Sequence, residues 1–310
     1  MDQRLDLVLA SREHLALLRA VHLSDRQLYA RSSDLELSIQ AYLKIWLPSL
    51  DHNGDVDDAP GPPPLEVAWV WHLHKLDPVS YQRDCIQWYG RLVDAREDIC
   101  PFCFADTLQF PNQVSTDTDS EFIERISACA KRQSTLLWQL CWPEYEDPVF
   151  LKESVDRYKM MLELMRQNPD QFIVPTYDID NIWHTHLAYP GLYLECCQQL
   201  VGRHVGHDDS VNDRSDGSKL RLCTATTERL WNDAFRCPWR RDGGMFRGEP
   251  PTWYWSHRSR AAGPCPAQGP RPTVAQGVES SRFVEVVGFA FGAASEPEVS
   301  TSFARFACTA

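Results

Sequence analysis

Two histidine pairs with the same spacing and similar neighbours are the residues of this chain best suited to chemistry. They lie in Trp71-His72-Leu73-His74 and Trp183-His184-Thr185-His186, and two acids, Asp178 and Asp180, precede the second pair. Imidazole and carboxylate groups bind Zn or Fe, and they also act as general acids and bases. The pattern is therefore compatible with a metal site, with a metal-free acid–base site, or with two sets of buried core histidines.

The two pairs belong to longer segments that match at an offset of 112 residues (183 − 71 = 112). The other residues that match at this offset are Pro78 and Pro190, Tyr81 and Tyr193, Cys85 and Cys197, Gly90 and Gly202, and Arg91 and Arg203. An upstream match of Ser38 with Ser154 has an offset of 116, which indicates a shorter loop before the second pair. Such self-similarity predicts two duplicated units, about 3–95 and 120–205, packed about a pseudo-twofold axis.

Apolar residues at helical spacing predict the elements that would position these histidines. Helices are expected over 3–23, 34–47, 65–77, 81–92, 121–140, around 154–158, and over 178–190, 191–201 and 226–235. Asp178 is the predicted N-cap of the second histidine helix, and Thr224 or Thr226 the predicted cap of the last one. The sequence thus predicts an all-α domain over 1–245, in which a closing helix near 224–235 follows the two units.

Within one helix, residues i and i+2 point about 200° apart, so the two histidines of a pair cannot face the same way. The apolar stripes direct His74 and His186 toward the core and turn His72 and His184 aside. One interpretation makes His74 and His186 neutral, hydrogen-bonded core residues. In the other, they meet near the pseudo-twofold axis and bind Zn or Fe. The candidate ligands are His72, His74, His184, His186, Asp178, Asp180 and Glu66.

Composition narrows the choice of function. The net charge of −12 disfavours RNA and excludes DNA as an expected partner, because phosphate backbones bind basic surfaces. No apolar run approaches the roughly 18 residues of a membrane span, and the first residues do not have the pattern of a secretory signal. The eleven cysteines have irregular spacing and are interpreted as reduced thiols. We therefore expect a cytoplasmic protein, with the nucleus as the alternative.

The end of the chain has a different character. Residues 246–310 are rich in Pro and are predicted to form an extended, mostly irregular tail with one strand near 282–287. Arginines alternate with aromatic residues over 239–258, a pattern that suits docking of a protein partner or stacking of bases. The alternative is that this segment folds back and buries its aromatic side chains on the helical body.

Several motifs resemble those of the glycine-rich domain-containing proteins, best described in plants. They are Trp69 to Pro78 with Tyr81 and Asp84-Cys85, Pro175 to His186, Gly202-Arg203, His207 to Ser210, Asp213 to Ser215, Thr227 to Trp231 and Gly244 to Gly248. The resemblance covers most of residues 5–250 and implies an intracellular protein linked to developmental and stress signalling. It supplies no reaction. Some relatives carry glycine-rich and proposed RNA-binding segments, whereas this chain has a Pro-rich tail and 15 Gly in all.

Three functions follow from these observations. The first is a non-catalytic interaction or regulatory module with an unknown protein partner, because the sequence contains no recognised catalytic constellation. The second is a metal-dependent enzyme with Zn or Fe between the two units. The third is RNA binding, which the acidic charge disfavours.

Overall fold

A computed structural model describes residues 5–50, 61–94, 99–105 and 120–256 of the chain. Helices form nearly all of the regular structure in these ranges, where one isolated parallel bridge joins Pro64 to Ala105 and no strand is present. The predicted all-α fold is therefore confirmed. Among the same residues, no helix is both long and apolar enough to cross a membrane.

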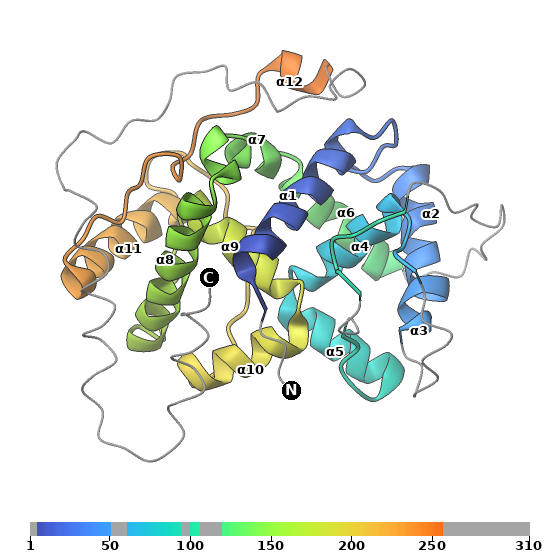
Figure 1. Cartoon of the computed structure of the whole chain (residues 1–310), viewed down its shortest axis with the longest axis horizontal. Coiled ribbons are helices and arrows are strands. Elements are labelled where there is room, and N and C mark those ends of the chain that lie inside the picture. Colours follow the sequence, from blue (N-terminus) through green and yellow to red (C-terminus); the bar gives the residue numbers. More distant parts are fainter. Residues whose placement is uncertain (1–4, 51–60, 95–98, 106–119, 257–310) are drawn as a thin grey trace.

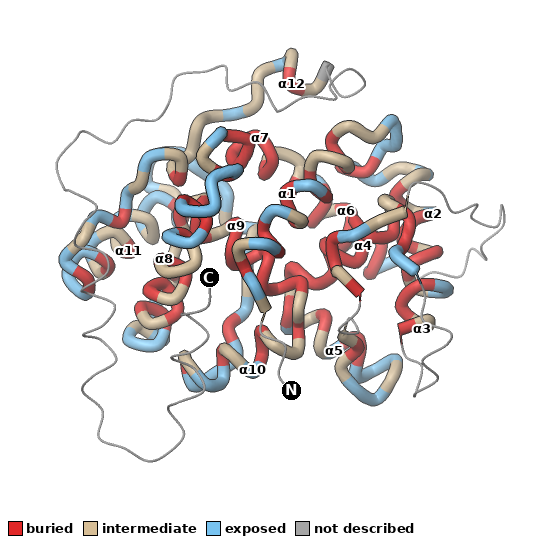
Figure 2. Tube along the Cα trace, in the orientation of Figure 1, coloured by how far each residue is buried: buried red, intermediate tan, exposed pale blue. Residues whose placement is uncertain are grey.

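The helix α1 (Leu7–Leu23) lies at the centre of the molecule, against both histidine helices (Figure 1). These are α4 (Leu65–Lys75) and α9 (Tyr177–Leu187). Asp6 begins α1 by accepting hydrogen bonds from the backbone N–H groups of Val8 and Leu9, an N-cap arrangement. Buried residues concentrate where α1, α4 and α9 meet (Figure 2).

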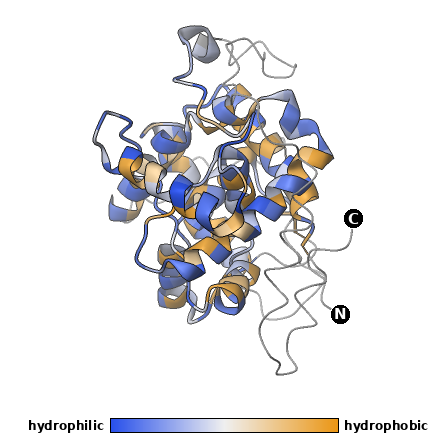
Figure 3. Ribbon diagram, turned by 90° about the vertical axis from the view of Figure 1, so that its left-hand side faces the viewer, coloured by the Kyte–Doolittle hydropathy of each residue, from blue (hydrophilic) through white to orange (hydrophobic). Residues whose placement is uncertain are grey.

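The remaining helices cover this centre. Around α4 lie α2 (Ser33–Ala41), a π-helix (Tyr42–Trp46), α3 (Leu47–Ser49), α5 (Pro78–Tyr89) and α6 (Ser120–Gln133). The second half contains α7 (Leu136–Leu140), a 3-10 helix (Pro143–Glu146), α8 (Pro148–Gln167), α10 (Pro190–Leu200), α11 (Lys219–Phe235) and α12 (Thr252–Ser256). Most of them show one hydrophobic and one hydrophilic side (Figure 3), as helices do when one stripe packs on a core.

The regions around α4 and α9 contain matching hydrogen bonds. Trp71 donates its indole N–H to the hydroxyl of Tyr81 over 3.3 Å, and this hydroxyl donates to the carbonyl of Val93 over 2.7 Å. Hydrogen bonds of 3.1 and 2.8 Å join the residues 112 positions further along, which are Trp183, Tyr193 and Val205. Each chain of hydrogen bonds fastens a histidine helix to the helix that follows it and to the loop beyond.

Three local predictions need correction. The helix expected over 121–140 is divided into α6 and α7 at Ser134 and Thr135, where the hydroxyl of Ser134 donates to the carbonyl of Lys131. Asp178 lies inside α9 instead of capping it, since its carboxylate is held by arginine side chains. The last long helix begins at Lys219, where Ser218 is the N-cap and accepts a hydrogen bond from Arg221 N.

The aromatic segment folds back onto the helical body. Trp239 and Tyr254 are buried, and the guanidinium of Arg247 lies 3.4 Å from the ring centroid of Trp138. Tyr254 also stacks on His22 of α1. The tail expected to be extended therefore contains the short helix α12, while residues 257–310, with the predicted strand near 282–287, lie outside the described residues.

Candidate functional site

All four histidines of the two pairs are buried, with exposed fractions of 1% to 3%. The prediction that His72 and His184 turn away from the core was wrong. Both α4 and α9 are covered on that side by α1, so each helix buries more than one face.

The second histidine of each pair lies in a tyrosine pocket. Tyr42 contacts His74 Nδ1 at 2.8 Å, and the other ring nitrogen of His74 lies 3.1 Å from Asp84 Oδ2. Tyr158 contacts His186 Nδ1 at 3.0 Å. Burial lowers the pKa of both histidines to about 4. These contacts are those expected of neutral core histidines.

The first histidine of each pair lies beside a third one that the sequence analysis did not select. His14 of α1, His72 and His184 each place a ring nitrogen within 4.8 Å of the others. The ring of His14 lies 4.8 Å from that of His72 and 6.2 Å from that of His184, centroid to centroid. Phe102 packs on the same group, 5.1 Å from His14. We call His14, His72 and His184 the inner trio.

The nitrogens of the inner trio are poorly satisfied. His14 Nε2, both ring nitrogens of His72, and His184 Nδ1 are buried and have no hydrogen-bond partner of normal geometry among the residues that the structure describes. Burial lowers the pKa of His14 to about 3, and it holds the pKa values of His72 and His184 well below the usual range. Buried polar atoms without partners are rare in folded proteins and call for an explanation, of which a bound ion is one.

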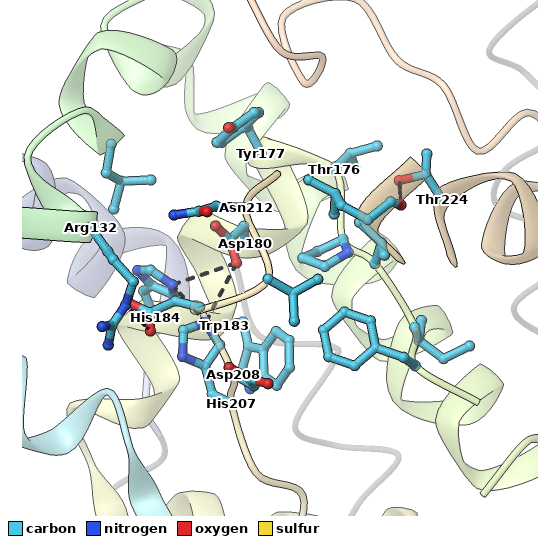
Figure 4. Close-up of a pocket in the computed structure, with 18 of the residues that line it drawn as sticks. Arg132, Thr176, Tyr177, Asp180, Trp183, His184, His207, Asp208, Asn212 and Thr224 are labelled. Atoms are coloured by element: carbon cyan, nitrogen blue, oxygen red, sulfur yellow. Dashed lines mark hydrogen bonds and ion pairs between the residues drawn. The ribbon is translucent and has the colours of Figure 1, made fainter. Parts of the chain in front are cut away.

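A second group shares His184 and opens onto a pocket. His184 Nε2 lies 3.0 Å from His207 Nε2, and Asp180 Oδ1 lies 3.5 and 3.9 Å from these two nitrogens (Figure 4). We call Asp180, His184 and His207 the outer trio. Asp180 and His184 are four residues apart on α9, and therefore lie on one face of the helix. His207 comes from the loop after α10, where the sequence His207-Asp208-Asp209 indicates a solvated acidic loop or, as the alternative, a cation site.

The backbone orients the ring of His207. Its Nδ1 lies 3.0 Å from the carbonyl oxygen of Leu76, so this nitrogen is the donor and Nε2 is left as a lone pair facing the other two members. Burial raises the pKa of Asp180 to about 6, an effect that the nearby His207 opposes. Two imidazoles and one carboxylate are the ligand types found at Zn and non-haem Fe(II) sites.

The pocket beside the outer trio has a volume of about 870 Å³. Asp180, His184 and His207 form part of its wall (Figure 4), and Arg203, Arg214, Tyr177 and Phe246 also line it. Arg214 lies 3.8 Å from the ring centroid of Phe246 and donates to the hydroxyl of Tyr177. His14 and His72 are not among the lining residues, so the outer trio faces the pocket and the inner trio lies behind it.

The other acids proposed as ligands serve different contacts. Asp178 is fully buried and accepts hydrogen bonds from Arg157 and Arg241, at 2.8 and 3.2 Å. Glu66 lies 3.5 Å from the exposed Arg26. Within the described residues, the groups of side chains close enough to share a metal contain neither Asp178 nor Glu66, and neither His74 nor His186.

Little in the sequence distinguishes His14 and His207 from other core and loop residues. His14 belongs to the buried stripe of α1 with Ser11, Leu15 and Leu18, where it looks like any core position. His207 is followed by Asp208 and Asp209, and these acidic neighbours are typical of a solvated loop. His207 follows Val205 by two residues, and the hydrogen bond from the Tyr193 hydroxyl to the Val205 carbonyl fixes the backbone just before it.

Together the fold and the site define an all-α protein with a buried histidine cluster at the wall of a pocket. The family model described as glycine-rich domain-containing protein-like matches residues 100–196. Glycine-rich domain-containing protein 2 of Arabidopsis thaliana is 34% identical over 280 residues, and glycine-rich domain-containing protein 1 of the same plant is 33% identical over 277. The chain belongs to the glycine-rich domain-containing protein family, which confirms the resemblance.

The matches cover 81% and 79% of this chain but only 35% and 34% of the two relatives. The chain thus spans about a third of the length of these proteins. No solved structure matches the chain.

Proposed function

We propose that this chain is a metal-dependent enzyme in which the outer trio binds a Zn or Fe ion at the wall of the 870 Å³ pocket. The observation that carries the proposal is the convergence of Asp180 Oδ1 with the Nε2 atoms of His184 and His207, 3.0 to 3.9 Å apart. Ligands placed tetrahedrally at 2.0–2.2 Å around Zn are about 3.3 Å from one another, so small side-chain movements would complete the geometry.

The surroundings support this assignment. The Leu76 carbonyl fixes the tautomer of His207 that leaves Nε2 free, as the second shell does at many metal sites. Three protein ligands leave coordination positions open toward the pocket, the arrangement of catalytic rather than structural sites. A bound ion would supply Lewis acidity or activate a water molecule there.

The pocket also indicates the class of substrate. Arg203 and Arg214 line it, and neither makes an ion pair with any described residue. Arg214 is held between the hydroxyl of Tyr177 and the ring of Phe246, which keeps its guanidinium at the pocket wall. A small carboxylate or phosphate fits such cations.

Metal content of the purified, tag-free protein tests the proposal. After incubation with Zn²⁺ or anaerobic Fe²⁺ and removal of free metal, we expect an ion that is lost in the His207→Ala and Asp180→Asn variants. His204→Ala is the matched control, because His204 is exposed and lies three residues before His207. Folding of each variant is checked by circular dichroism. Wild-type protein without metal, or variants with wild-type metal content, would refute the assignment.

The substrate class has its own test. A thermal-shift panel of small carboxylates and phosphates is expected to stabilise the metal-loaded wild type, and the Arg214→Gln variant less. An equal response of the two proteins would remove Arg214 from substrate binding.

The interaction or regulatory role, the cytoplasmic location and the link to developmental or stress signalling remain proposals from the family resemblance. Burial of Trp239 and Tyr254 on the helical body favours the pocket over segment 239–258 as the place where this chain meets another molecule.

A further inference from the structure

We infer that the inner trio, His14, His72 and His184, is a second metal site, closed to solvent, for an ion that prefers imidazole, Zn²⁺ or Cu⁺. His184 would be shared between this site and the outer one. The inference does not depend on metal binding by the outer trio.

The first support is the convergence of donors. The three histidines come from three helices far apart in sequence, α1, α4 and α9, and still place ring nitrogens within 4.8 Å of one another. Each of the three is buried, with exposed fractions of 0%, 1% and 2%. Burying several histidines without hydrogen-bond partners costs free energy, because the ring nitrogens lose their hydration and form no other polar contact.

The second support is the state of these nitrogens. His72 has no hydrogen-bond partner at either ring nitrogen, although a neutral imidazole carries one donor and one acceptor. Among the described residues, His14 Nε2 makes no hydrogen bond of normal geometry, although the side chain of Asn181 is close enough to raise the pKa of His14; its Nδ1 lies 3.3 Å from the Thr185 hydroxyl. This pattern leaves one nitrogen of His14 free for an ion and positions the ring from the other side.

The third support is the second nitrogen of His184. Its Nε2 contacts His207, whereas its Nδ1 is buried and unpaired. An imidazole can bind one metal through each nitrogen if it is deprotonated. His184 therefore has the chemistry needed to belong to both trios.

The surroundings define the kind of ion. Trp69 and Phe102 pack on His72, with ring centroids 5.6 and 6.1 Å away, and no carboxylate belongs to the inner trio. Neutral imidazole donors without oxygen ligands suit Zn and Cu far better than Mg²⁺ or Ca²⁺. An enclosed site of this type would stabilise the packing of α1 on α4 and α9, the contact at the centre of the fold.

Substitutions that keep the ring but remove its nitrogens give a sharp test. His14→Phe and His72→Phe preserve an aromatic group beside Trp69 and Phe102. His22→Phe is the matched control, because His22 is a buried histidine of α1 outside both trios. The full chain is loaded with Zn²⁺, or with Cu⁺ under reducing conditions, and bound metal and melting temperature are measured with and without the ion.

We expect two ions per chain in the wild type, one in His14→Phe, His72→Phe and His207→Phe, and none in His184→Phe. The metal-induced rise in melting temperature should shrink in the inner variants, whose metal-free forms should melt no lower than the wild type. His22→Phe should retain both ions. The arm with the larger rise, Zn²⁺ or Cu⁺, identifies the preferred ion.

The other outcomes separate the two sites. A wild-type ion lost only from Asp180, His184 and His207 variants would overturn the inner site and leave the proposed function standing. An ion lost only from His14, His72 and His184 variants would overturn the proposed function and leave the inner site standing. One ion lost from every trio variant would overturn the inference of two sites in favour of a single mixed site, and a metal-free wild type would overturn both.

Discussion

The two histidine regions share a scaffold but differ in the side chains around it. In both, a tyrosine hydroxyl contacts the second histidine of the pair, Tyr42 with His74 and Tyr158 with His186. The first region adds a carboxylate, Asp84, next to His74, whereas Cys196 occupies the matching position of the second. The shared Trp-His-x-His motif thus lies in two different electrostatic environments.

The difference is larger at the first histidine of the pair. Asp180 precedes His184 by four residues, and the position 112 residues earlier is Ala68. The Asp180 carboxylate and the 870 Å³ pocket therefore lie beside the first histidine of the second pair, while the first region contributes His72 to the inner trio. A histidine at a repeated position can have a purely structural role. Its neighbouring side chains decide whether it can also bind a metal or act as an acid or base.

The largest expected difference concerns Asp178 and its counterpart Glu66. Asp178→Ala should lower the free energy of unfolding by about 3–5 kcal/mol, because the buried guanidinium of Arg157 loses its carboxylate. Glu66→Ala should cost less than about 1 kcal/mol, because its partner Arg26 is exposed. Urea unfolding of the two variants measures both values, and equal losses would contradict the comparison.

A second prediction concerns acid. His74 and His186 have pKa values of about 4 when folded, against about 6.5 when unfolded. The unfolded chain therefore binds more protons, and stability should fall as the pH drops from about 6.5 to about 4, by up to about 1.4 kcal/mol per pH unit for each histidine. Their contributions should be similar, because burial is the largest cause of the lowered pKa at both histidines.

Urea unfolding at pH 7, 6 and 5 checks this expectation in His74→Gln and His186→Gln. Each variant should lose the same part of the pH slope, whatever its stability at pH 7. A slope unchanged in one of them would show that folding does not lower the pKa of this histidine.

A third prediction tests the matching hydrogen bonds. Tyr81→Phe and Tyr193→Phe each leave a buried indole N–H and a backbone carbonyl without a partner, and each should destabilise the protein by about 1–3 kcal/mol. The two losses should agree within about 1 kcal/mol in thermal or urea unfolding. A much smaller effect in one region would show that its scaffold tolerates rearrangement.

The smallest expected effects lie at the starts of α5 and α10. Asp77 caps α5 through Ser80 N, whereas α10 is capped from the other half of the chain by Asp94, which accepts from Gly191 N over 2.7 Å. Asp77→Ala and Asp94→Ala should each cost about 0.5–2 kcal/mol.

Gly191→Ala sharpens this prediction. A Cβ on Gly191 would lie 2.5 Å from Asp94 Oδ2, so the substitution should destabilise the wild type and have little effect once Asp94 is Ala. A double-mutant cycle on unfolding free energies measures the coupling. Additive effects would mean that Asp94 does not cap α10.

Much of the fold could be predicted from local sequence. Helical spacing and prolines located α4, α5, α9 and α10, because apolar periodicity and the fixed φ of proline act within a few residues. The division of α6 from α7 was missed, since the apolar pattern continues across Ser134 and Thr135, between the two helices. The choice of Asp178 as a cap was wrong because a distant arginine competes for its carboxylate.

The sequence by itself determined the helical class, the family, and the positions of the two histidine helices with His74 and His186 on their core sides. The tertiary structure decided which histidines meet: α1 covers both helices and brings His14 to His72 and His184, and the loop after α10 brings His207 to Asp180. Periodicity reports only which face of a helix is apolar. The partner across that face depends on packing between segments more than 100 residues apart.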